Sequence, residues 1–151
     1  MRPIPKSSIG VLIADDSAAV CKLIAHLLQR ERSTHIVGVA ANLEDALHLA
    51  VEYTPDILLL DLHLDDLAGH DPLSVKIGFL SSVRHVIAMS TRSDEEEREF
   101  AQLYGASRLV DKFFLSEQLV PTILSCAKPE RPLTATPPRR RQHQALNRWA
   151  S

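Results

Sequence analysis

The sequence is poor in the residues that crosslink small secreted proteins. It contains only two cysteines, Cys21 and Cys126, which lie far apart and outside any C-x-x-C pair. Their scarcity excludes a disulfide scaffold and gives no sign of a zinc site. Long apolar runs are also missing: the longest, Ile57–Leu60, is far too short to cross a bilayer, and the N-terminus lacks a signal-peptide core. We therefore expect a soluble, cytoplasmic protein that does not enter membranes.

No strong excess of one charge is present, since the formal net charge is −2. The charges are nevertheless unevenly distributed. Residues 128–151 carry six Lys and Arg side chains against one acid, a net of +5, which leaves −7 on residues 1–127. The basic segment also contains several prolines and little apolar material, so it is expected to be a disordered tail or linker.

What the sequence does have is an alternation of short apolar segments with amphipathic ones. The apolar segments have the length of strands that are buried on both faces. Five strands are expected, at residues 9–14, 35–41, 56–62, 83–90 and 109–111.

Between these segments, apolar residues recur at helical spacings of three and four. Helical stripes fall at residues 20–28, 43–51 and 73–80, with N-caps expected at Ser17, Asn42 and Asp71. A fourth helix is expected to start in the acidic segment 93–97 and to end at Gly105, and a fifth to cover 117–127 despite Pro121. Strict alternation of strand and helix predicts an α/β, doubly wound parallel sheet, because each return to the same edge needs a crossover helix.

Polar residues follow the predicted strands, and in an open parallel sheet ligands bind outside the carboxyl ends of the strands. The residues at those positions are Asp15, Asp16, Asp61, Ser90, Thr91, Asp111 and Lys112. The three carboxylates of Asp15, Asp16 and Asp61 would repel one another without compensation, which suggests a bound divalent cation. Oxygen ligands favour Mg²⁺, and a lysine with a hydroxyl opposite suits the oxygens of a phosphoryl group.

These residues carry a resemblance to a known family. Residues 9–127 resemble the receiver domain of two-component response regulators, and the matching segments are 11–16 with the acidic pair, 56–62 with an aspartate at the strand end, 86–90 with the hydroxyl, and Gly105-Ala106 followed by Lys112. The resemblance implies a flavodoxin-like sheet of five parallel strands in the order 2-1-3-4-5 with five helices. It also implies a phosphorylation-dependent signalling switch that changes its partner-binding surface, and not an enzyme acting on external substrates.

The resemblance implies a role for each matching residue. Asp61 would accept a phosphoryl group from a sensor histidine kinase or a histidine phosphotransfer protein. Asp15, Asp16, Asp61 and the backbone carbonyl of His63 would bind Mg²⁺. Ser90 would hydrogen-bond the phosphoryl group and Lys112 would pair with its oxygens. The downstream partner and a possible homodimer are left open.

Three positions depart from the family pattern. Leu109 stands at the switch position that is usually aromatic, and Phe113 replaces a proline after the lysine, so a trans Lys112–Phe113 bond is expected. Asp65 replaces another proline, and the resulting Asp65-Asp66 pair is expected to form a solvated turn. The side chain of His63 is expected to border the site.

Two other functions compete with this interpretation. Haloacid-dehalogenase-type phosphatases also use a strand-end aspartate, but they need a second aspartate where this chain has His63, and their acidic pair comes last instead of first. A truncated DNA-binding regulator is the other alternative, although residues 128–151 are too few for a helix-turn-helix domain, so this chain itself is not expected to bind nucleic acid.

Overall fold

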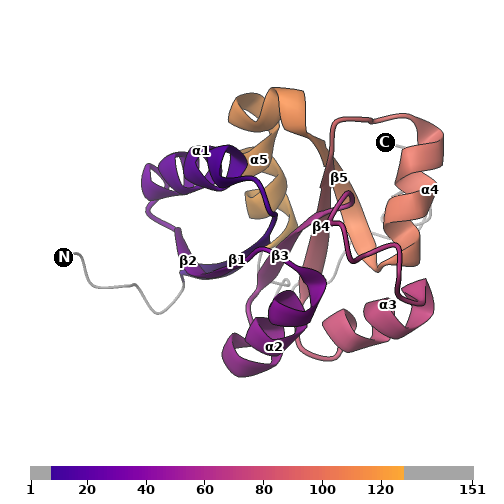
Figure 1. The fold of residues 1–151 in the computed structure, drawn as a ribbon. Helices are drawn as coiled ribbons and strands as arrows, with labels where there is room; N and C mark the ends of the chain where they lie inside the picture. The colour runs from indigo at the N-terminus through magenta and orange to yellow at the C-terminus, as the bar shows by residue number, and fades with distance from the viewer. Residues whose placement is uncertain (1–7, 128–151) are drawn as a thin grey trace, which may run out of the picture.

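Five parallel strands form the centre of the computed structural model, which describes residues 8–127 (Figure 1). The strands are β1 (Ile9–Ala14), β2 (Thr34–Ala40), β3 (Ile57–Asp61), β4 (His85–Ser90) and β5 (Ala106–Asp111). They lie in the order β2-β1-β3-β4-β5, which confirms the predicted flavodoxin-like fold. The inner strands β1, β3 and β4 are buried on both faces, which is why they read as continuous apolar runs.

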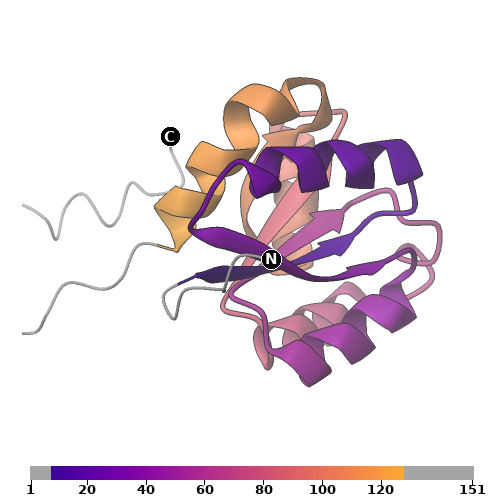
Figure 2. The same ribbon diagram turned by 90° about the vertical axis from the view of Figure 1, so that its left-hand side faces the viewer.

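Helices cover both faces of this sheet. They are α1 (Ala18–Gln29), α2 (Leu43–Tyr53), α3 (Pro72–Leu80), α4 (Glu95–Leu103) and α5 (Leu115–Cys126). The apolar sides of α1 and α5 pack on one face, and those of α2, α3 and α4 pack on the other. Figure 2 shows the two layers, with α1 and α5 above the sheet and α2 and α3 below it.

The predicted helix caps are confirmed. The side chains of Ser17, Asn42 and Asp71 each accept a hydrogen bond from the backbone N–H three residues later. The fourth helix has a cap of the same kind at Asp94, so it begins at Glu95 and not at residue 93. Local side-chain chemistry therefore decides where these helices begin.

Several predicted boundaries were wrong. β5 begins at Ala106 instead of residue 109, because it is an edge strand paired only with β4 and its half-buried residues form no apolar run. β4 begins two residues later than predicted, at His85. The fifth helix starts at Leu115 instead of residue 117 and continues through Pro121.

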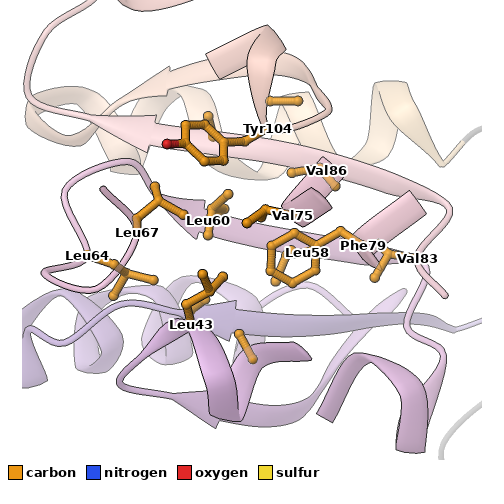
Figure 3. Close-up of a cluster of buried hydrophobic side chains, with 14 of the residues drawn as sticks. Leu43, Leu58, Leu60, Leu64, Leu67, Val75, Phe79, Val83, Val86 and Tyr104 are labelled. Carbon is orange, nitrogen blue, oxygen red and sulfur yellow. The ribbon is translucent and has the colours of Figure 1, made fainter. Parts of the chain in front are cut away.

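The core on the face covered by α2, α3 and α4 also fixes the loop between β3 and α3. Leu64 and Leu67 of this loop are buried, and Figure 3 shows them turned toward Leu60 and Leu43. Burial of two leucines stabilises the loop by an amount on the order of 3 kcal/mol or more. This anchoring positions His63, which directly follows the buried end of β3 and Leu62.

Three further predictions concern the termini, membranes and cysteines. The basic segment 128–151, with its predicted disorder, lies outside the described residues. None of the helices within residues 8–127 has the length and apolar character of a membrane span. Cys21 and Cys126 are free and half-buried.

The acidic pair after β3 has two different environments. Asp65 is exposed in a turn, as predicted. Asp66 instead holds the start of α2, because its two carboxylate oxygens accept the N–H of Leu43 at 3.0 and 2.9 Å. An acid at this position also interacts favourably with the helix dipole.

We expect Asp66→Ala to lower the free energy of unfolding by about 1–2 kcal/mol, because the N–H of Leu43 loses its charged acceptor. Urea denaturation followed by circular dichroism measures the change. Asp65→Ala is the matched control and should stay within about 0.5 kcal/mol of the wild type. Equal effects of the two substitutions would show that Asp66 does not stabilise α2.

Candidate functional site

The parallel register brings the predicted site residues to one edge of the sheet. Ala14 of β1 lies opposite Leu60 of β3, so Asp15 and Asp61 follow side by side. Ser90, at the end of β4, lies opposite Asp111 of β5, and Lys112 comes next. The site is therefore assembled from four strand ends that are distant in sequence.

Three carboxylates meet at this edge. One oxygen of each of Asp15, Asp16 and Asp61 lies within 4.8 Å of the others. Asp15 and Asp61 are each only 2% exposed, whereas Asp16 is exposed. Like charges at this separation repel one another, so the cluster requires a nearby positive charge.

Lys112 supplies one such charge. Its Nζ lies 2.8 Å from Asp15 Oδ2 and 3.1 Å from Asp61 Oδ1. Burial lowers the pKa of Lys112, but the hydrogen bond with Asp15 and the attraction of Asp61 outweigh that effect, so its pKa lies above the ordinary value. One cation thus compensates two buried carboxylates.

The remaining acceptor capacity suits a metal cation. Asp15 Oδ2 is buried without a hydrogen bond of regular geometry, so its compensation is the ion pair with Lys112. The other oxygen, Asp15 Oδ1, accepts from the N–H of Ser17 at 2.8 Å. The exposed carboxylate of Asp16 adds a charge that Lys112 does not contact. An all-oxygen, strongly anionic donor set of this kind fits Mg²⁺.

Ser90 is fully buried, and its hydroxyl is hydrogen-bonded to Glu97 of α4. Its Oγ donates a hydrogen bond to Glu97 Oε2 and accepts one from the N–H of Arg92 at 3.0 Å. The ring of His63 joins the same group, with Nε2 3.1 Å from Glu97 Oε2 and 3.3 Å from Ser90 Oγ. The backbone N–H of His63 meanwhile donates to Asp61 Oδ1 at 3.0 Å.

Glu97 is the residue that sequence reasoning missed. It belongs to the acidic segment 93–97, for which the sequence predicts the start of a helix with acids suited to the positive end of its dipole. The signal was present nevertheless, because Glu97 shares a helical stripe with Ala101 and Tyr104, both of which are buried. An acid on the inward stripe of a helix needs polar partners inside the protein.

The other strand-end residues are peripheral. Thr91 is exposed, and Asp111 Oδ1 accepts the N–H of Phe113 at 2.8 Å, where Lys112–Phe114 form a 3-10 turn. The Lys112–Phe113 bond is trans, as predicted. Leu109 is half-buried against the core that carries α2, α3 and α4.

This arrangement matches a known family. Residues 11–124 match the response regulator receiver domain. The chain belongs to this family. Receiver domains are phosphorylation-dependent signalling switches, which confirms the predicted function and favours neither the phosphatase nor the DNA-binding alternative.

Curated relatives and solved structures agree with this assignment. The chain is 36% identical over 107 residues to protein-glutamate methylesterase/protein-glutamine glutaminase 5 of Myxococcus xanthus, covering 70% of this chain but only 30% of that relative. Two solved receiver domains, of NarL from Mycobacterium tuberculosis and CheB from Thermotoga maritima, give TM-scores of 0.71 and 0.69 at 22% and 20% identity. Each comparison covers 82% of this chain and 99% of the solved one, so this chain shares the fold of almost the entire solved domain.

The ion pairs of Lys112 predict that substitutions of Asp15 and Asp16 change the free energy of unfolding differently. In metal-free protein, Asp15→Ala should lower the free energy of unfolding by about 1–3 kcal/mol, because Lys112 and the N–H of Ser17 lose a buried partner. Asp16→Ala should leave it unchanged or raise it slightly, because an exposed like charge is removed.

Urea denaturation in EDTA at neutral pH measures both free energies. Glu99→Ala, which removes an exposed acid of α4 at some distance from Asp15 and Asp16 in the chain, controls for the change in net charge. Equal stability of the Asp15 and Asp16 variants would contradict the ion-pair assignment.

Proposed function

We propose that Asp61 of this receiver domain is the residue that is phosphorylated, by a sensor histidine kinase or a histidine phosphotransfer protein. The observation that carries the proposal is the position of its carboxylate, 3.1 Å from Lys112 Nζ and within the cluster formed with Asp15 and Asp16. A nucleophilic carboxylate needs such surroundings to receive a group that is itself strongly anionic.

Asp15, Asp16 and Asp61 would hold Mg²⁺ together with the backbone carbonyl of His63. The proposal is supported by the oxygen donor set and by the receiver domain of a sensor histidine kinase from Pseudomonas aeruginosa, solved with magnesium in its active site cleft. The comparison with that domain gives a TM-score of 0.66 at 18% identity, and it covers 81% of this chain and 99% of the solved one. When bound, the cation supplies charge that stabilises the transferring phosphoryl group.

The residues of the chain have separate tasks in the transfer. A carboxylate oxygen of Asp61 attacks phosphorus in line, forming an O–P bond while the P–N bond to the donor histidine breaks. The N–H of His63 holds Asp61 Oδ1 and thereby orients the carboxylate. Lys112, already beside Asp61, pairs with the phosphoryl oxygens as their charge develops.

Phosphorylation then changes the surface of the domain. It adds about −1.5 to −2 of charge and three acceptor oxygens at the end of β3, and Ser90 is the hydroxyl placed to answer it. Residues 9–127 would form the complete switch and 128–151 a linker. The domain itself would act on no external substrate and would bind no nucleic acid.

The output is a partner protein or a joined effector domain. The chain spans 30% of the length of the methylesterase relative, and a second methylesterase relative, from Bacillus subtilis, is covered to 39%. An effector of the protein-glutamate methylesterase class is therefore the first output partner to test.

The acceptor assignment predicts that Asp61→Asn abolishes phosphorylation by acetyl phosphate in the presence of Mg²⁺, because an amide oxygen is a poor nucleophile. Intact-mass spectrometry measures incorporation, and circular dichroism verifies the fold. Asp65→Asn, an exposed acid in the following loop, is the control and should incorporate as the wild type does. Continued incorporation in Asp61→Asn would refute the assignment.

A further inference from the structure

Glu97 has a position that its sequence neighbours do not share. It lies in the first turn of α4 and is 4% exposed, whereas Glu95 and Glu96 of the same turn are exposed to solvent. Its carboxylate is turned toward the end of β4, where Ser90 lies. A carboxylate is removed from water only at a cost unless hydrogen-bond donors surround it, so its partners are informative.

Those partners are Ser90 and His63, at the ends of the strands that form the candidate site. Glu97 Oε2 accepts the hydroxyl of Ser90, and Nε2 of His63 lies 3.1 Å away. Because a carboxylate only accepts hydrogen bonds, the His63 nitrogen donates here. The N–H of Glu97 in turn donates to Asp94 Oδ1 at 2.8 Å, so the cap of α4 fixes the residue in place.

We propose that Glu97 is a positioning residue that holds Ser90 and the first turn of α4 in the unphosphorylated arrangement, and that a phosphoryl group on Asp61 competes with Glu97 for the Ser90 hydroxyl. This inference rests on the proposed phosphorylation of Asp61. It adds a specific inhibitory contact within this chain and a specific route by which phosphorylation reaches α4.

The competition follows from the chemistry of serine. A hydroxyl has one hydrogen to donate, and in this structure it is donated to Glu97. When Ser90 turns to the phosphoryl oxygens, Glu97 loses its buried donor and faces a second anion. Both changes disfavour its buried position, and because Glu97 belongs to the first turn of α4, its outward movement displaces that turn.

The surroundings leave space for this movement. A cavity of about 460 Å³ opens directly beside Glu97, between the loop after β3 and α4, and His63, Leu64, Arg92 and Phe100 are among its lining residues. A carboxylate that leaves Ser90 enters this space without displacing the core. The guanidinium of Arg92 already pairs with Asp94 and Glu96 at 2.8 and 3.3 Å, so the expelled carboxylate is stabilised by solvent.

The route also fits the departure at Leu109. A leucine makes no hydrogen bond, so it has no polar contact to exchange when Ser90 moves. The bond between Ser90 and Glu97, in contrast, exists in one state and is lost in the other. A two-state element is biased only by contacts that differ between its states, and this contact has that property.

The test is a beryllofluoride titration of the full chain with Mg²⁺, since beryllofluoride imitates the phosphoryl group on an aspartate. Glu97→Ala should bind it about tenfold more tightly than the wild type, because a charge-assisted hydrogen bond no longer competes for Ser90. Glu97→Gln has the same shape and keeps an acceptor for Ser90, so its affinity should lie between the two. It also provides a variant that folds if the alanine variant does not.

A second measurement separates positioning from general stability. In two-dimensional NMR spectra without beryllofluoride, the amide signals of α4 in Glu97→Ala should move along the line toward their positions in beryllofluoride-bound wild type. Glu95→Ala, in the same turn but exposed, is the control and should change neither the affinity nor these signals.

The outcomes distinguish this inference from the proposed function. Wild type that binds beryllofluoride, with Glu97→Ala and Glu97→Gln no tighter than Glu95→Ala, would overturn the inference alone. Wild type that binds none would overturn the phosphorylation of Asp61 and the inference together. In Asp61→Asn, neither Glu97 substitution should restore binding, and restored binding would also refute the competition.

Discussion

The interaction on which the site depends is the pairing of Lys112 with two buried carboxylates. Asp15 and Asp61 end neighbouring strands and are held out of water, so their mutual repulsion would oppose the fold without the Nζ at 2.8 and 3.1 Å. The parallel sheet creates this requirement, because it brings the carboxyl ends of β1, β3 and β5 to one edge. The same geometry creates the opportunity for chemistry: a carboxylate held beside a cation is prepared to receive an anionic group.

A second group of polar residues lies beside the carboxylates paired with Lys112 and connects them to α4. Ser90, His63 and Glu97 form a hydrogen-bonded set whose members come from β4, the loop after β3 and α4. The backbone of His63 contacts Asp61 while its ring contacts Glu97, so one residue touches both groups. The cluster of Asp15, Asp61 and Lys112 is therefore in direct contact, through His63, with α4. In this chain the connection consists of polar contacts made by the backbone and the ring of His63, and leucine stands at position 109, which is usually aromatic in the family.

The apolar core explains why these polar contacts are well defined. Leu64 and Leu67 fix the loop that carries His63, and the buried stripe of α4 fixes the side of the helix from which Glu97 projects. Phosphoryl chemistry at a strand end requires only carboxylates, a cation and a hydroxyl. To change a distant surface, a contact at the site must also be carried by a packed helix or loop, so that a local change can shift the whole element. The packed helices of this domain, α4 among them, are such elements.

The sequence by itself determined the fold class, three helix caps and the strand-end residues, because each depends on local pattern: apolar runs, helical spacing, and serine, asparagine or aspartate before a helix. It did not determine the start of β5, since an edge strand buries too little to leave an apolar run. Nor did it show that Asp66 caps α2 across the loop or that Glu97 faces Ser90. Both are carboxylates in acidic segments that look solvated in one dimension. Only tertiary packing decided that Asp65 and Glu95 face water while Asp66 and Glu97 face the protein, because the direction of a side chain is set by what the whole fold places beside it.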